Sequence, residues 1–401
     1  MLWVRTFGGG SPEYQSYHQL VSDPAGNVTI SALGNNSVSF GSTNISLTGQ
    51  NGILVQYDVN GNIRWIQQPS GWVQYMTYDS GRMYVAFDGN STNYIGGMTN
   101  TSDRKWALAA LNATNGQALW LLGIGSEKND YNSNGQSFDT PQIAVSGTNV
   151  FVTGTGWGSN AVFGAYSVSW PQPNGQYFAR YDTNGNAQLA APFGGTRVAP
   201  WVAKADPSGN VYVAGDFDGY ATFGSKTIAG PHYDDIGGGQ FFGQIFVAKF
   251  DRDGNNLWVR QAINHVSYVN VRDMALAADG IWVDGFLNQN ASFGPYNVTG
   301  PITCVGTPFC SLDYYVGGFL AKITETTPAT AVTILNPQRS NNTIQFSFVS
   351  QTGHTNAIEA RTNLTLGVWT ELTNFIGDGT LKQFNFTSTN PPIRFFRVRT
   401  Q

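Results

Sequence analysis

The acidic residues are the first candidates for chemistry, because a pair of carboxylates can supply the acid and base of glycoside hydrolysis. Asp216, Asp218 and Asp284 each follow an apolar strand-like run, where the end of a strand can open on a pocket. Their spacing defines no acid/base pair, and a solvated loop is the simpler explanation. They are the candidates for ligand contacts, and we expect no catalytic residue.

A second polar cluster lies in a glycine-rich stretch and comprises His232, Asp234 and Asp235. These side chains could contact a metal or a sugar, although an exposed loop is the simpler interpretation. The four histidines show no metal-ligand spacing, and neither a nucleophile-elbow nor a phosphate-loop motif is present. We accordingly expect no cofactor and no bound metal.

Most of the other aspartates occupy turn sequences of the form Asp-x-x-Gly-Asn or Asp-x-Gly. Aspartate, asparagine and glycine favour such turns, because their side chains bond to the local backbone and glycine adopts positive φ. We therefore predict turns between strands at these positions: Asp23, Asp58, Asp79, Asp182, Asp206, Asp251, Asp253 and Asp279.

Composition excludes several classes of protein. Charged residues make up 11% of the 401 residues, and the net charge is -4 without any run of Lys or Arg, which argues against a nucleic-acid partner. No apolar run approaches the roughly 18 residues of a membrane span. The 41% of hydrophobic residues and the many aromatics predict a packed, β-rich protein.

The cysteines and sequons favour an extracellular location. Cys304 and Cys310 could close a short loop as a disulfide, or remain two free thiols; a disulfide would place the chain outside the reducing cytosol. The start of the chain lacks a signal-peptide core, so a cytoplasmic protein or a mature secreted chain are both open, and we favour the second. Asn-x-Ser/Thr sequons, possible glycosylation sites, occur at Asn27, Asn35, Asn44, Asn90, Asn100, Asn112, Asn290, Asn297, Asn341, Asn363 and Asn385.

A turn-plus-strand unit recurs about every 60 residues, five times before residue 325. Each unit adds a second strand and then a third that begins at Trp65, Trp120, Leu189 or Trp258. Units of this length and strand content predict a β-propeller of about five four-stranded blades over residues 1–325. The fifth unit lacks its last strand, so we expect the N-terminal strand to complete it and close the ring.

These repeats resemble the SBBP-type β-propeller repeat proteins of bacterial secreted and surface chains. The resemblance covers residues 2–325 and rests on Trp-Val-Arg-Thr-Phe-Gly-Gly at 3–9, Asp206-Pro-Ser-Gly-Asn-Val-Tyr-Val-Ala-Gly, and Ile245-Phe-Val-Ala-Lys-Phe-Asp-x-Asp-Gly-Asn-x-x-Trp258. It implies an extracellular location. The family has no shared catalytic residues, and it usually has more blades than five.

The composition changes after a small linker at 326–331. Short alternating strands over 332–401 predict a β-sandwich of the immunoglobulin or fibronectin kind. Residues Ile358–Leu364 and Arg394–Val398 resemble a C-terminal module of bacterial secreted proteins.

The functional expectation is a secreted, non-catalytic structural or interaction protein of the cell surface or an extracellular assembly. We expect the partners to be copies of itself or other surface proteins, because a weakly charged, hydrogen-bonding surface favours such contacts. One example is a filament with head-to-tail contacts between propeller and sandwich. A glycan- or peptide-binding propeller is the first alternative, and a polysaccharide hydrolase or lyase is the second.

Overall fold

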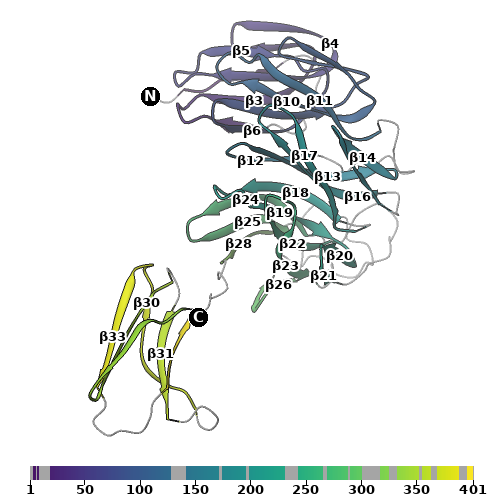
Figure 1. The fold of residues 1–401 in the computed structure, drawn as a ribbon. Coiled ribbons are helices and arrows are strands. Elements are labelled where there is room, and N and C mark those ends of the chain that lie inside the picture. Colours follow the sequence, from purple (N-terminus) through teal and green to yellow (C-terminus); the bar gives the residue numbers. More distant parts are fainter. Residues whose placement is uncertain are drawn as a thin grey trace. The chain divides into compact units, whose positions relative to one another are not determined.

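The computed structural model is all-β (Figure 1). It describes residues 3–5, 7–8, 19–127, 141–170, 174–195, 198–230, 243–264, 269–287, 290–299, 317–324, 332–351, 355–362, 368–387 and 395–400. The chain divides into two compact units, Met1–Ile323 and Thr324–Gln401.

The described residues of the first unit form five antiparallel sheets that follow one another along the sequence (purple to green in Figure 1). The first sheet comprises β1 (Phe7–Gly8), β2 (Leu20–Ser22), β3 (Val28–Phe40), β4 (Thr43–Tyr57) and β5 (Ile63–Gln67). The second comprises β6 (Val73–Asp79), β7 (Arg82–Asp88), β10 (Arg104–Asn112), β11 (Ala118–Glu127), β14 (Asn160–Phe163) and β15 (Tyr166–Ser169). The third comprises β12 (Gln142–Ser146), β13 (Asn149–Trp157), β16 (Asn174–Asp182) and β17 (Ala187–Phe193).

The fourth sheet comprises β18 (Val198–Ala205), β19 (Val211–Phe217), β22 (Gln244–Phe250), β23 (Asn256–Asn264), β26 (Asn290–Phe293) and β27 (Tyr296–Thr299). The fifth comprises β24 (Val269–Ala277), β25 (Gly280–Leu287) and β28 (Gly317–Ile323). Two hairpins stand apart, β8 (Thr92–Ile95) with β9 (Met98–Thr101), and β20 (Tyr220–Phe223) with β21 (Lys226–Ala229). The middle strands of these sheets are almost wholly apolar and buried, as in β7 and β19, so the core lies between neighbouring sheets.

The predicted Asp-x-x-Gly-Asn turns are confirmed in one repeated geometry. In the turn that begins at Asp58, its carboxylate accepts the backbone N–H of Asn60 and of Asn62, each at 2.8 Å, and the side-chain amide of Asn62 at 3.0 Å. Gly61 supplies the positive φ of 77°. The bonds from Asn62 and Asn60 hold the pKa of Asp58 below its ordinary value. Closely similar turns, closed by the same backbone and side-chain bonds of the Asn, begin at Asp23, Asp182, Asp206 and Asp251.

Tryptophans lock one sheet onto the turn of the next. The indole Nε1 of Trp65 donates to the carbonyl of Ala113 at 3.0 Å, and Trp120 donates to Thr183 at 2.9 Å. The accepting carbonyl follows the first residue of the turn in both cases. A glycine in each turn leaves room for the ring, because a Cβ on Gly185 would lie 2.9 Å from Trp120. Bulkier turn residues would therefore separate the two sheets.

Backbone pairing joins successive sheets in a constant register. In each outer strand, the residue five positions after the Trp or Leu pairs through its backbone with a hairpin of the next unit. Its partner in that hairpin is the residue just before the Phe or Ile that ends the first hairpin strand. The bonded pairs are Ser70 with Tyr94, Gly125 with Val162, Gly194 with Thr222, and Ile263 with Ser292. We call this combination of docked side chain and bonded hairpin the sheet junction.

The expected closure of a ring by the N-terminal strand is wrong for the described residues. Phe7 and Gly8 form β1, which pairs with β3 of the first sheet, and no described strand pairs with the second edge of β28. No described sheet closes on itself. The described part of the segment is instead held by the first sheet, where Trp3 Nε1 donates to Val59 at 3.0 Å and the ring lies over Gly61.

The second unit contains two three-stranded sheets. One comprises β29 (Leu335–Ser340), β30 (Thr343–Val349) and β33 (Leu381–Thr387), and the other β31 (Thr355–Arg361), β32 (Thr370–Ile376) and β34 (Phe395–Thr400). They pack through phenylalanine rings, with Phe346 and Phe396 centred 6.0 Å apart. Glu359 is nearly buried and accepts from Arg397 at 2.5 Å and from Arg399 at 2.8 Å, so its charge is paired.

Candidate functional site

The first strands of the sheets lie next to one another and frame a small cavity. β6 packs against β12, β12 against β18, and β18 against β24. Alternating small side chains allow these strands to approach closely, and the space left among them measures about 200 Å³. It is lined by Tyr75, Thr77, Ile143, Ala144, Val145, Ala203, Lys204, Ala205 and Leu276.

Tyr75 and Lys204, which line the cavity, and Asp273, which pairs with Lys204, come from three different sheets. The Tyr75 hydroxyl donates to the carbonyl of Ala203 at 3.5 Å, and the Lys204 ammonium lies 3.3 Å from the carboxylate of Asp273. Burial opposes the charge of Lys204, but attraction to Tyr75 and Asp273 outweighs it, so the pKa of Lys204 lies above its ordinary value. Lys204 therefore carries its positive charge at neutral pH and lies beside the Tyr75 phenol, and the two side chains could contact a small polar ligand.

A buried carboxylic acid occupies the fourth sheet. Asp216 in β19 accepts from the indole nitrogen of Trp201, and Gly243 packs directly on its side chain. Burial raises the pKa of Asp216 to about 8. Below that pH the group is a neutral hydrogen-bonding acid, so its structural role differs from that of the ionised aspartates in the turns.

Because the unfolded chain ionises Asp216 near pH 4 and the folded chain only near pH 8, the folded state binds one more proton between these values. The free energy of unfolding should therefore fall as the pH rises from about 4 to about 8. Asp216→Asn keeps an oxygen acceptor for Trp201 and removes this loss. We expect the melting temperature of the variant, relative to the parent, to rise by about 5 °C between pH 5 and pH 8.

The matched control is Asp103→Asn, because this carboxylate is 71% exposed. Differential scanning calorimetry at closely spaced pH values measures both variants. A parent and an Asp216→Asn variant that melt in parallel across this range would contradict the assignment.

The structure does not bring the sequence-predicted ligand contacts into one site. Asp218 is buried just after β19, whereas Asp284 is exposed in β25 of another sheet, opposite Asp273. His232, Asp234 and Asp235 lie outside the described residues, as do Cys304 and Cys310. Sequence reasoning missed Tyr75 and Lys204. Both residues lie in the strand just before a repeated turn, and the repeat makes this strand the first of its sheet. Polar residues in these first strands are the signal that could have identified the two.

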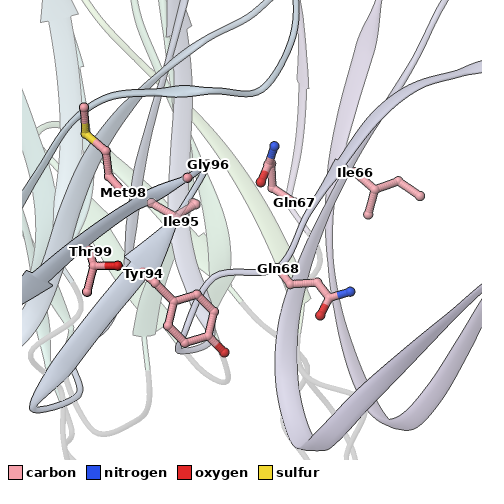
Figure 2. Close-up of a pocket in the computed structure, with 9 residues that line it drawn as sticks. Ile66, Gln67, Gln68, Tyr94, Ile95, Gly96, Met98 and Thr99 are labelled. Carbon is pink, nitrogen blue, oxygen red and sulfur yellow. The ribbon is translucent and has the colours of Figure 1, made fainter.

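A shallow groove of about 410 Å³ lies between the end of β5 and the β8–β9 hairpin. Figure 2 shows Tyr94 and Met98 on the hairpin side and Gln67 and Gln68 on the other. Tyr94 is 44% exposed and Met98 is 38% exposed. An exposed aromatic ring opposite two side-chain amides combines an apolar platform with hydrogen-bonding groups.

The predicted sequons differ in their exposure. Asn44, Asn297, Asn341 and Asn385 are exposed, and these positions could carry a bulky modification. Asn27, Asn90, Asn100 and Asn112 are half-buried, and Asn27 is bonded to Asp23 within its turn. Asn363 lies outside the described residues, as do the side chains of Asn35 and Asn290.

The described residues contain neither a metal-binding cluster nor a membrane-spanning helix. No three His, Cys, Asp or Glu side chains in this part of the chain gather closely enough to hold a metal ion. The same residues include no helix with the length and apolar character of a membrane span.

Comparisons with known proteins give no family. No family model matches the chain, and no curated protein matches it. Solved structures do match, among them a quinohemoprotein alcohol dehydrogenase, ADHIIG from Pseudomonas putida HK5, at 10% sequence identity. The match covers 65% of this chain and 39% of that one, with a TM-score of 0.29. A similarity this low supports no inference about activity.

Proposed function

We propose that the chain is a secreted, non-catalytic structural or interaction protein of a cell surface or extracellular assembly. Its five sheets form a propeller-type series, followed by a β-sandwich, and its partners are copies of itself. The observation that carries this proposal is the backbone pairing of the sheet junction, which recurs in one register between all successive sheets of the described residues. A surface that joins sheets repeatedly within a chain is suited to joining sheets between chains.

The surface chemistry supports self-association. Charged residues are 11% of the chain and the net charge is only -4, so copies repel one another weakly. Large apolar side chains stand exposed on several strands, including Leu320 at 67% and Ile376 at 66%. Such side chains at strand edges favour contacts with a further strand.

The test is the assembly state of the purified full-length protein. We expect light scattering to give a mass that rises with concentration, and electron microscopy to show ordered chains of repeating subunits. A single-subunit mass that stays constant up to millimolar concentration would refute the proposal.

The groove beside β8 and β9 favours a second candidate function, the binding of a glycan. Tyr94 would stack on a sugar ring while Gln67 and Gln68 bond to hydroxyls. Tyr94→Ala should reduce binding on a glycan array at least tenfold, and Tyr166→Ala, which removes a comparably exposed ring from another hairpin, should leave it unchanged. Equal binding by the two variants, or none by the parent, would reject this candidate.

A further inference from the structure

The N-terminal segment occupies the place of an outer strand on the first sheet. Trp3 docks on the β4–β5 turn as Trp65 and Trp120 dock on later turns. Five residues further on, Gly8 pairs with Ser39, the residue before Phe40 at the end of its hairpin. This is the register of every other sheet junction. One side of the segment is thus committed to the first sheet, and among the described strands none covers its other edge.

The fifth sheet presents the complementary edge. In the fourth sheet, β22 pairs with β23, so that Lys249 opposes Trp258 and Val247 opposes Arg260. β28 has the equivalent sequence, with Phe319-Leu-Ala-Lys322 in place of Phe246-Val-Ala-Lys249. Its second edge is unpaired among the described strands, and Leu320 at the position of Val247 is 67% exposed.

The side-chain contacts of the N-terminal segment resemble those of β23, and the contacts of β28 resemble those of β22. Trp3-Val4-Arg5 repeats the sequence of Trp258-Val259-Arg260, and each arginine lies over its tryptophan, at 5.7 Å and 5.6 Å. The ammonium of Lys322 lies 5.1 Å from the ring of Trp282, as that of Lys249 lies 4.9 Å from Tyr212. The segment and β28 therefore match each other as β23 matches β22.

We propose that β28 of one copy pairs with residues 3–5 of a second copy, with Leu320 opposite Arg5 and Lys322 opposite Trp3. This inference rests on the proposed self-assembly and names its contact. The segment stays docked on the first sheet of its own copy. The fifth sheet of one copy is therefore followed by the first sheet of the next copy, and the two are joined by one more sheet junction. Each copy offers one such strand and one such edge, so the contact is heterologous and continues from copy to copy as an open chain.

Cysteine cross-linking of the full-length protein tests the pairing. Arg5→Cys and Leu320→Cys proteins, made separately, are mixed and oxidised mildly, and the linked peptides are identified by mass spectrometry. Directly opposed residues of antiparallel strands lie within disulfide range. We expect a covalent dimer through positions 5 and 320, and higher oligomers from the double variant.

The matched control is Val4→Cys mixed with Leu320→Cys, because adjacent side chains of a strand point to opposite faces. Val4 is 82% exposed, so its cysteine is accessible. We expect at least tenfold less dimer from this mixture. Equal yields, or a 5–320 disulfide formed within single chains of the double variant, would overturn the proposal.

The failure of this inference is distinguishable from failure of the proposed function. Ordered chains in electron micrographs without a 5–320 link would reject the strand pairing and leave self-assembly standing. A constant single-subunit mass together with no link would reject both.

Discussion

Replacing Trp120 with alanine should lower the free energy of unfolding of the first unit by about 3–5 kcal/mol, the usual cost of truncating a buried tryptophan. Trp120 is 8% exposed, packs at 6.1 Å from Tyr84, and belongs to the core between the second and third sheets. Its removal leaves a cavity over Gly185 and removes one of the two hydrogen bonds to the Thr183 carbonyl, which also accepts from Arg82. Urea denaturation followed by far-ultraviolet circular dichroism measures the loss.

The control for this prediction exists within the chain, because Leu189 stands where the repeat otherwise has tryptophan and packs near Gly254 of the next turn. Trp120→Leu retains much of the apolar contact but removes the hydrogen bond. We expect it to cost about 1–2 kcal/mol. A cost for Trp120→Ala no larger than that for Trp120→Leu would show that the apolar contact of the docked side chain adds little to the sheet junction.

Gly215→Ala should be among the most damaging single-methyl changes, with a loss of about 3 kcal/mol from overpacking. A Cβ at this position would lie 2.0 Å from the carbonyl oxygen of Ala199. The neighbouring strand shifts register between Pro200 and Val202, which brings that carbonyl close. Gly285 repeats the arrangement in the fifth sheet, with 2.1 Å to the oxygen of Asn270, so Gly285→Ala should behave alike.

Gly318→Ala is the matched control for Gly215→Ala. It lies in a strand of the same kind, but the nearest atom to its added Cβ is 3.8 Å away. We expect a change of less than about 1 kcal/mol, with alanine slightly favoured because glycine weakens a strand. Thermal melts of Gly215→Ala and Gly318→Ala, measured under the same conditions, compare the two losses of stability. Similar losses would mean that the close approach at Gly215 relaxes without cost.

The local structure followed from the sequence because each repeated turn carries its own bonding partners. Asp206 to Asn210 closes on itself, so the residue types alone identify the turn and the strands on either side. In the second unit, the alternation at Thr343 and at Thr355 likewise located β30 and β31. Whether a segment forms a strand or a turn depends here on residues close to it in the sequence, so the sequence alone was enough to predict it.

Positions that depend on distant partners were not predictable in this way. The docking of Trp3 depends on a turn 56 residues away, and either the first or the fifth sheet would accept the same strand sequence. The reach of Tyr75 to Ala203 spans 128 residues. The sequence placed Asp216 at the end of an apolar run, but it did not show the packing of Gly243 on this side chain or the burial that raises its pKa.

The self-contained turns also bear on how the chain folds. A turn closed by its own carboxylate and amide needs no contact from another sheet, so its hairpin can form within about 1–10 microseconds in the unfolded chain. Five such turns, from Asp23 to Asp251, give folding several equivalent starting places rather than one nucleus. A substitution at any single turn should therefore change the unfolding rate more than the folding rate, because the remaining turns can still start the process.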